Sequence, residues 1–149
     1  MDGKDEGVMT MIMRLARLQF QYMHAQLERL DLYPGQPQLL LALRDRENVS
    51  QKELAQAMEV TPATLTVMLR RMDAKHLVNR TSDPQDLRVT RLSLTPAGRE
   101  KVREIEMIIT QANDTLDDLF LPEELDRVCV MMRRVCAQLG LMTQDRGGI

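Results

Sequence analysis

The chain has 149 residues, of which 44% are hydrophobic and 28% charged, and its formal net charge is −2 at pH 7. These proportions predict one globular domain with a core of its own and exclude a disordered chain. No apolar run approaches about 18 residues, so no membrane segment is predicted. The opening residues, MDGKDEGVMT, lack the basic region and apolar run of a signal peptide, so a cytoplasmic location is expected.

A first long helix is expected from Val8 to about Leu30. Its apolar residues form two stripes, which cover a wider arc than a helix packed against a single core requires. One stripe is Met9, Met13, Ala16, Phe20, Met23, Leu27 and Leu30, and the other is Val8, Met11, Ile12, Leu15, Leu18 and Tyr22. A second subunit would explain the extra apolar surface, and burial in the centre of a monomeric bundle is the alternative.

A turn-rich segment, Tyr33 to Pro37, precedes a short helix over Gln38 to Arg46. Leu39, Leu40 and Leu43 are expected to face inward from this helix, because they recur at helical spacing.

Two helix starts follow closely. Ser50 and Glu53 form an S-x-x-E capping box, and Thr61 and Pro62 form a second start, with threonine as N-cap and proline in the first turn. The buried stripe of the second helix is predicted to be Leu65, Met68, Leu69 and Met72. Two short helices across a tight turn are typical of a helix-turn-helix, whose second helix enters a DNA major groove.

A hairpin is predicted directly after this helix. Leu77 to Thr81 reads as a strand, residues 82–86 (SDPQD) are rich in turn formers, and Arg88 to Leu94 alternates in polarity. A helix-turn-helix followed by a hairpin is a winged helix. The predicted fold class is therefore all-α with a small, two-stranded β-wing.

Two further helices are expected. One begins at Thr95 and Pro96 and runs from residue 97 to about Phe120, and the other begins near Pro122 and ends with Gly140 as its C-terminal cap. The last helix is expected to bury Leu125, Val128, Cys129, Met132, Val135, Cys136 and Leu139. The expected layout of this single domain is a winged-helix part over about residues 36–95, with dimerisation helices over about 8–30 and 97–140.

The charge is unevenly distributed. Residues 50–91 hold seven Lys or Arg and five Asp or Glu, a local charge of +2, whereas the rest of the chain carries −4. Attraction to phosphate depends on the local field, because distant acids are screened beyond about 8–10 Å. The positive excess lies on the helix-turn-helix and wing, as DNA binding requires.

The stretch from Ser50 to Arg99 resembles the MarR family of bacterial transcriptional regulators. The resemblance rests on SQKELAQAM, TPATLTVMLRRMDAKHLV, the wing segment DPQDLR and LSLTPAGR. It implies a homodimer that binds double-stranded DNA, usually a repressor released by a small molecule or an oxidant. The two-fold symmetry of such a dimer implies a pseudo-palindromic operator. Family members commonly carry glycine where His76 stands and a polar or basic residue where Val67 stands.

The candidate DNA-contacting residues lie around the second helix and the wing. Threonine hydroxyls suit bases or phosphates, and the alanine and valine suit a thymine methyl. Arg70 and Arg71 are expected on phosphates, and Arg88 in a minor groove with Asp86 holding it by a charge-assisted bond. The alternative for the last pair is an exposed hairpin with a solvated ion pair. The full set is Ser50, Gln51, Thr61, Pro62, Ala63, Thr64, Thr66, Val67, Arg70, Arg71, Asp86 and Arg88.

An effector site is implied by the resemblance, since MarR-like proteins bind ligands between their dimerisation helices and winged part. In this chain that junction would draw on Met13, Arg17, Phe20, His24, Leu40 and Met107. Arg17 and His24 would orient a small aromatic or anionic compound in an apolar cavity. The twelve methionines suit an adaptable lining, although an ordinary core uses methionine in the same way.

The two cysteines carry an alternative, redox-sensing function. Cys129 and Cys136 are seven residues apart, about 10.5 Å along one helix, which exceeds the roughly 7 Å Cα separation that a disulfide spans. A disulfide would therefore have to cross a dimer interface. The favoured interpretation is that both are small buried side chains.

No enzyme, metal or cofactor is predicted. The sequence has no Walker loop and no G-x-S-x-G, H-E-x-x-H or C-x-x-C motif. A metal site would have to combine His24, Cys129, Cys136 and carboxylates, whose spacing favours no shared site. Two other functions remain open, a winged-helix module that binds protein without binding DNA and a ligand carrier without DNA affinity.

Overall fold

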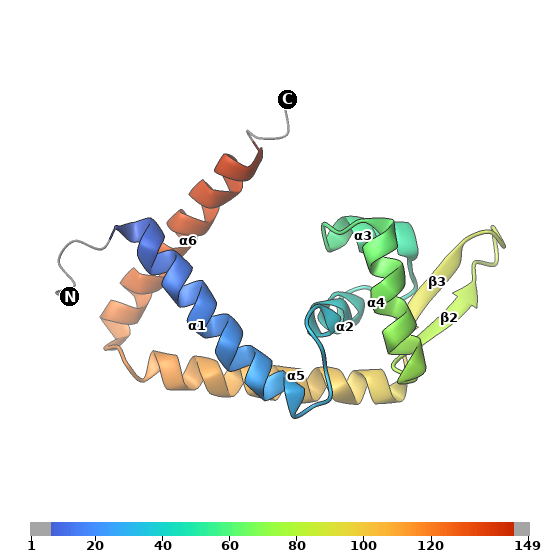
Figure 1. Ribbon diagram of the computed structural model, residues 1–149, viewed down its shortest axis with the longest axis horizontal. Helices are drawn as coiled ribbons and strands as arrows, with labels where there is room; N and C mark the ends of the chain where they lie inside the picture. The colour runs from blue at the N-terminus through green and yellow to red at the C-terminus, as the bar shows by residue number, and fades with distance from the viewer. Residues whose placement is uncertain (1–6, 145–149) are drawn as a thin grey trace. The chain divides into compact units, whose positions relative to one another are not determined.

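The computed structural model describes residues 7–144, and its contacts divide the chain into two units, Met1–Ile108 and Ile109–Ile149 (Figure 1). The boundary falls inside α5 (Pro96–Asp117). The first unit therefore holds every element up to the first part of α5, and the second holds the rest of α5 and α6 (Pro122–Gln144). Within residues 7–144, no helix combines the length and the apolar character that crossing a bilayer demands.

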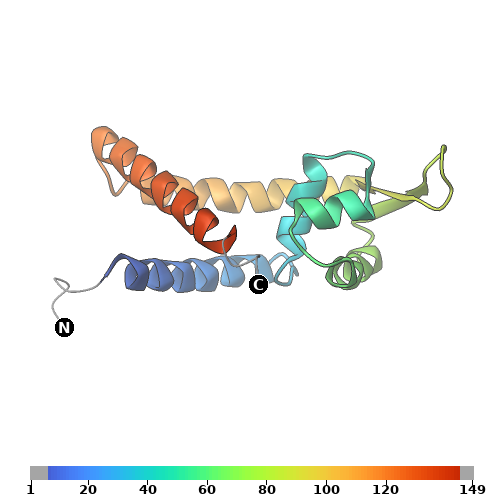
Figure 2. The ribbon, with the colours of Figure 1, turned by 90° about the horizontal axis from the view of Figure 1, so that it is seen from above.

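The first unit contains a winged helix. Its elements are α2 (Gln36–Arg44), β1 (Val49–Ser50), α3 (Gln51–Ala57), α4 (Pro62–Ala74), β2 (Val78–Ser82) and β3 (Thr90–Leu94). The predicted hairpin of β2 and β3 is confirmed, but the sheet has three strands because β1 pairs antiparallel with β3 in the order β1-β3-β2. Two views at right angles show the turn of this hairpin projecting beyond the helices α2 to α4 (Figures 1 and 2).

The core of the winged helix is formed by the residues that the spacing predicted. The side chains that are at most 5% exposed include Leu39, Leu40, Leu43, Leu54, Leu65, Leu69, Met72, Leu92 and Leu94. Met68, the remaining member of the predicted α4 stripe, is half-buried against Gly35. Gly35 has a φ of 89°, and a Cβ there would lie 2.9 Å from Met68 Cε. The turn before α2 therefore requires glycine.

Both predicted helix starts are confirmed. Ser50 Oγ accepts a bond from Glu53 N (3.2 Å), and Glu53 Oε2 accepts one from Ser50 N (2.8 Å), which completes the capping box of α3. Thr61 Oγ1 accepts from Thr64 N (3.1 Å) and so caps α4, with Pro62 in its first turn. These side chains pair backbone N–H groups that an isolated helix end leaves without partners. They hold the two helices of the helix-turn-helix at defined starting points.

The end of α4 has the backbone geometry that the usual glycine would favour. His76 has a φ of 53°. His76 N donates to Asp73 O (2.9 Å) and Leu77 N donates to Met72 O (3.1 Å), which is the pair of bonds of a Schellman motif. Histidine tolerates positive φ at some cost.

His76→Gly is therefore expected to leave stability unchanged or to raise it by up to about 1 kcal/mol, because glycine adopts positive φ without strain. Denaturant unfolding of the two proteins measures the difference. Lys75→Gly, one residue earlier at a negative φ of −98°, is the control and should destabilise. A clear loss of stability in His76→Gly would mean that the imidazole makes a stabilising contact.

α1 (Val8–Glu28) ends slightly earlier than predicted, and none of its residues is buried by the chain itself. Most residues of the two predicted apolar stripes are exposed, such as Met13 (67%) and Leu15 (51%), whereas Ile12, Met23, Leu27 and Leu30 are half-buried. An amphipathic helix normally hides its apolar side, so α1 carries apolar surface that its own chain does not cover.

Two predictions for α6 are wrong. Gly140 lies inside the helix and does not cap it, since Leu141 to Gln144 continue the helix and one internal glycine costs only about 1 kcal/mol. Met132 and Cys136 are exposed, and the other residues of the predicted buried stripe are half-buried. The apolar spacing of this helix was identified correctly, but the second unit contains too few neighbours to bury it.

Candidate nucleic-acid interface

α4 presents one buried and one exposed side. Leu65, Leu69 and Met72 anchor it in the core, and the opposite side is free of contacts with the core. All the candidate residues on the helix are exposed, namely Pro62, Ala63, Thr64, Thr66, Val67, Arg70 and Arg71. Val67 is 52% exposed, an arrangement that places an aliphatic side chain in solvent among hydroxyls and cations. Such a mixture matches the methyl groups, acceptors and phosphates of a major groove.

The hydroxyl groups near the start of α4 are partly engaged. Thr61 Oγ1 caps the helix and lies 2.9 Å from Thr64 Oγ1. Thr66 Oγ1 donates its proton to Pro62 O (2.8 Å), so toward an external partner this hydroxyl acts as an acceptor. Ser50 is occupied by the capping box of α3, and Gln51 is half-buried beside it. Ser50 and Thr61 therefore position the helices, and Thr66 is free to accept from a base amino group.

The wing turn is held by a residue that the sequence analysis did not single out. Arg91 on β3 donates from Nε to Asp83 Oδ2 (2.6 Å) and from Nη1 to Asn48 O (3.2 Å) and Glu53 Oε2 (3.3 Å). Asp83 Oδ1 also accepts from Gln85 N (2.7 Å). One guanidinium thus joins the wing turn, the loop before β1 and the cap of α3. The partners lie up to 43 residues away in the sequence, and no local pattern indicates them.

The predicted bond between Asp86 and the Arg88 guanidinium is replaced by another contact. Asp86 Oδ1 accepts from the backbone N–H of Arg88 (3.0 Å), because an aspartate two residues before an N–H is placed to close a turn on it. Within residues 7–144 the Arg88 side chain has no ion-pair partner. Asp86 therefore shapes the turn, and the Arg88 guanidinium stays available at its surface.

Ion pairing separates the seven cations of residues 50–91 into two groups. Three pair with carboxylates: Lys75 with Asp31 (2.8 Å), Arg80 with Asp73 (2.6 Å) and Arg91 with Asp83 (2.6 Å). The other four, which form no ion pair within the described part of the chain, are Lys52, Arg70, Arg71 and Arg88. Since the pairs also occupy most of the carboxylates of this region, the positive charge that remains is concentrated on α3, α4 and the wing.

The carboxylates of this network titrate below their usual range. The hydrogen bonds that Glu53 makes with Ser50 lower its pKa, and the Gln85 N–H, with the Arg91 guanidinium next in size, lowers the pKa of Asp83. A carboxyl whose pKa is lower in the folded state contributes stability above its unfolded pKa, and this contribution is lost as the pH falls through the folded value. The network should therefore hold the wing firmly at neutral pH and weaken in acid.

We expect the urea midpoint of the protein to fall when the pH is lowered below about 4. Asp83→Asn keeps an oxygen for the Gln85 N–H but removes the charge facing Arg91. This variant should therefore be less stable than the parent at pH 7, and acid should lower its stability by a smaller amount. Unfolding followed at a series of pH values measures both effects. Parallel loss of stability in the parent and in Asp83→Asn would rule out Asp83 as a source of the acid sensitivity.

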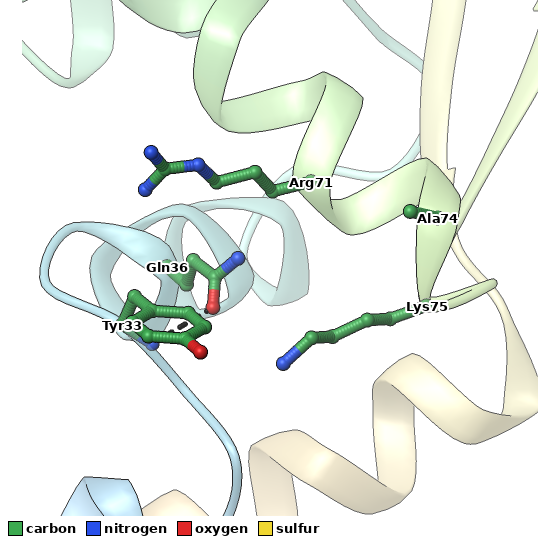
Figure 3. Close-up of a pocket in the computed structure, with 5 residues that line it drawn as sticks. All are labelled: Tyr33, Gln36, Arg71, Ala74 and Lys75. Carbon is green, nitrogen blue, oxygen red and sulfur yellow. Dashed lines mark hydrogen bonds between the residues drawn. The ribbon is translucent and has the colours of Figure 1, made fainter.

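The six residues proposed for an effector site are not brought together around a cavity. Leu40 lies in the winged-helix core with 0% exposure, while Met13, Phe20 and Met107 are each more than half exposed. The polar members contact their own helix: Arg17 Nη1 donates to Gln21 Oε1 (3.5 Å), and the ring of His24 stacks on Phe20 at 5.8 Å. A cavity of about 390 Å³ lies elsewhere in the first unit, lined by Tyr33, Gln36, Arg71, Ala74 and Lys75 (Figure 3). None of the six residues lines this cavity.

Both cysteines lie on α6, as predicted, so the helix between them separates their sulfur atoms. Cys129 is half-buried and Cys136 is exposed, which differs from the expected burial of both. Neither forms a disulfide in the chain.

Comparison with known proteins agrees with this architecture. The model of the MarR family matches residues 32–90. The HTH-type transcriptional repressor MdtR of Bacillus subtilis is 35% identical over 79 residues, which cover 53% of this chain and 51% of that protein. The chain spans about half the length of the first curated relatives that it matches.

Two solved structures extend the similarity of the fold to nearly the whole chain. The S. aureus MepR–DNA complex has a TM-score of 0.78 with 22% identity, over 90% of this chain and 99% of that one. The YusO protein of Bacillus subtilis has a TM-score of 0.71 with 26% identity, over 87% and 95%. The chain therefore has the winged-helix fold of these proteins, and its residues 32–90, which hold the helix-turn-helix and most of the wing, are similar to the MarR family.

Proposed function

We propose that this protein is a homodimeric, sequence-specific DNA-binding regulator of transcription. The observation that carries the proposal is the exposed side of α4, where threonine, valine and arginine side chains surround a helix anchored by a leucine stripe. In this proposal α4 enters the major groove, with Thr66 and Val67 against base edges. Arg70 and Arg71 contact phosphates, and Arg88 reaches the adjacent minor groove from the wing.

The positions of the unpaired cations favour DNA over a protein partner. Lys52, Arg70, Arg71 and Arg88 lie on the helix-turn-helix and wing, whereas the large exposed apolar side chains are concentrated on α1 and α6. A protein-binding module would be expected to present the apolar residues on its winged part. The MepR–DNA complex, which has the same fold, supports the same assignment.

The uncovered apolar surface supports homodimerisation. α1 buries none of its residues within the chain, and α6 exposes Val130, Met131 and Met132. Surfaces of this kind are covered in stable homodimers, whose interfaces resemble a divided hydrophobic core. A two-fold dimer would present two copies of α4 to half-sites about 34–36 Å apart, and hence to a pseudo-palindromic operator.

We further propose that the protein represses transcription and is released by a small aromatic or anionic effector. An effector acts only by binding the DNA-incompetent state more tightly, and a 100-fold preference shifts the equilibrium by about 2.7 kcal/mol. Thiol oxidation is the competing mechanism, because Cys136 is exposed. Replacing Cys129 and Cys136 with serine and comparing release by peroxide with release by aromatic acids separates the two.

The test is selection of binding sites from random duplex DNA, followed by sequencing, together with sedimentation of the free protein. We expect an inverted repeat whose half-sites are one helical turn apart and a dimer at micromolar concentration. A stable monomer would remove the symmetric binding mode. Recovery of no enriched sequence at low salt, where phosphate contacts are strongest, would contradict DNA recognition itself.

A further inference from the structure

Leu87 is the most exposed of the large apolar side chains in residues 7–144, at 81%, and it lies in the turn of the wing. Val89 N donates to Asp86 O (2.9 Å), so Leu87 and Arg88 occupy the two central positions of a β-turn. Turns are usually built from glycine, proline, asparagine, aspartate or serine, for reasons of backbone geometry and local hydrogen bonding. A leucine at this position contributes little to the core of its own chain and stays open to a partner.

Hydrogen bonds brace the turn that carries this leucine. Asp86 Oδ1 accepts from Arg88 N (3.0 Å) inside the turn. Asp83 N donates to Val89 O (2.9 Å), which closes the wider loop around it. Arg91 on β3 pairs with Asp83 at 2.6 Å and so fixes the base of this loop. A side chain on a braced turn loses little backbone freedom on binding, so more of its burial energy remains as affinity.

The charges beside Leu87 favour one class of partner. The Arg88 guanidinium forms no ion pair with the described residues, whereas Asp83 is engaged by Arg91 and Asp86 by a backbone N–H group. The tip of the wing therefore presents an apolar side chain next to an available cation. An apolar protein surface would bury that cation without a partner, while a DNA groove offers base and sugar surfaces between two rows of phosphates. The turn also projects beyond α2 to α4, where it can reach a groove next to that of α4 (Figures 1 and 2).

We propose that Leu87 is an apolar wedge that enters the minor groove beside Arg88 and partly separates two stacked base pairs. The inference rests on the proposed function, because it requires the wing to lie on DNA. Leucine is one of the side chains that proteins insert between base steps, where they open the minor groove and bend the duplex. Arg88 responds to the negative potential of the groove, whereas Leu87 makes the energy of opening a base step part of recognition.

The wedge gives the protein a preference between flanks of equal base composition. TA steps are flexible and easily kinked, whereas A-tracts are stiff and have a narrow minor groove. An arginine without a wedge favours the A-tract, because the narrow groove has the stronger negative potential. The parent protein should therefore bind an operator with alternating TATA flanks about fivefold more tightly than the same operator with AAAA flanks. The two duplexes carry the same charge and the same number of A·T pairs.

Fluorescence anisotropy of the full chain with these two duplexes, at one salt concentration, tests the wedge. Leu87→Ala should abolish or reverse the preference for TATA flanks, and Leu87→Met, which keeps a long apolar side chain, should retain it. Gln85→Ala is the matched control and should also retain it. Gln85 is exposed in the same turn, and its bond to Asp83 is made by its backbone N–H and not by its side chain. Because Leu87 lies outside the core, Leu87→Ala should unfold at the urea concentration of the parent.

The bend of the DNA is a second readout, one that a change in affinity alone does not move. Energy transfer between dyes at the two ends of the operator reports their separation at saturating protein. The parent should shorten this separation more than Leu87→Ala does, because only the parent inserts a wedge. Arg88→Ala, which weakens binding but keeps the leucine, should bend the saturated operator as the parent does.

Three results would overturn the assignment. One is equal affinity of the parent for the two flanks, and another is a preference that Leu87→Ala retains in full. The third is an operator that the parent and Leu87→Ala bend by the same amount. Any of these results in a parent that binds its selected operator would exclude the wedge and leave the proposed function intact. A parent without affinity for any selected DNA would overturn the proposed function and the wedge together.

Discussion

Gly98→Ala is expected to destabilise the folded chain by about 3 kcal/mol. The added Cβ would lie far inside van der Waals contact with Leu77 O, and within 3.2 Å of Leu94 Cδ2. The backbone there cannot move freely, because Leu77 O accepts from Thr95 N (3.1 Å) and Thr95 Oγ1 joins Gly98 N (2.9 Å) to His76 O (2.8 Å). These bonds tie the start of α5 to the end of α4, so the methyl group forces the junction apart.

Gly140→Ala is the matched control, since no atom of the described residues lies within 4 Å of a Cβ at Gly140, which is inside α6. The same substitution there should stabilise by about 0.5–1 kcal/mol through helix propensity. Urea unfolding of the three proteins gives the comparison. If Gly98→Ala unfolds at the same urea concentration as the parent, the close approach of α5 to Leu77 is wrong.

Arg88→Ala should weaken operator binding about tenfold or more, and most strongly at sites with A·T-rich flanks. The turn that presents Arg88 is closed by Asp86. The guanidinium has no carboxylate partner among the described residues, so its charge is available for a DNA phosphate or base. Arg71→Ala, by contrast, should weaken all sequences alike and reduce the salt dependence by about one ion.

Arg80→Ala is the control for loss of charge on the wing. Arg80 donates from Nε and Nη2 to the Asp73 carboxylate, at 2.6–3.1 Å. Because Asp73 balances its charge and occupies these donors, Arg80 should contribute little to phosphate binding. Fluorescence anisotropy with the selected operator at several salt concentrations compares the variants. Binding of Arg88→Ala equal to that of the parent at every salt concentration would exclude the wing from the interface.

Features of the fold that depend on near neighbours were predictable from the sequence. The capping box at Ser50, the Thr61–Pro62 start of α4 and the leucine stripes each depend on residues within four positions of one another. The positive φ at His76 agrees with the glycine that family members commonly carry at this position. The predicted boundaries of helices and strands differ by a few residues, as at β3, which begins at Thr90 and not at Arg88.

Features that depend on distant partners were not predictable. β1 is two residues long and is recognisable only because Val49 lies opposite Leu92. Arg91 reads as an ordinary outward residue of an alternating strand, yet it joins three segments. The cavity also depends on distant partners, because Gln36 lies in a turn-rich segment of the sequence and α4 forms the opposite wall. The burial of the Gln36 amide, whose Nε2 has no partner among the described residues, could not be predicted from neighbouring positions.

In the proposed homodimer, α1 would make the lifetime of a newly made chain depend on how soon it meets a second copy. A helix of 21 residues that its own chain does not bury gains little from tertiary packing, and isolated helices are only marginally stable in water. Its folding would then be completed by association, so the melting temperature would rise with protein concentration. Chains that have not assembled would be degraded by proteases. When synthesis slows, fewer chains would meet a partner in time, so the concentration of the protein would fall by a larger factor than the rate of synthesis.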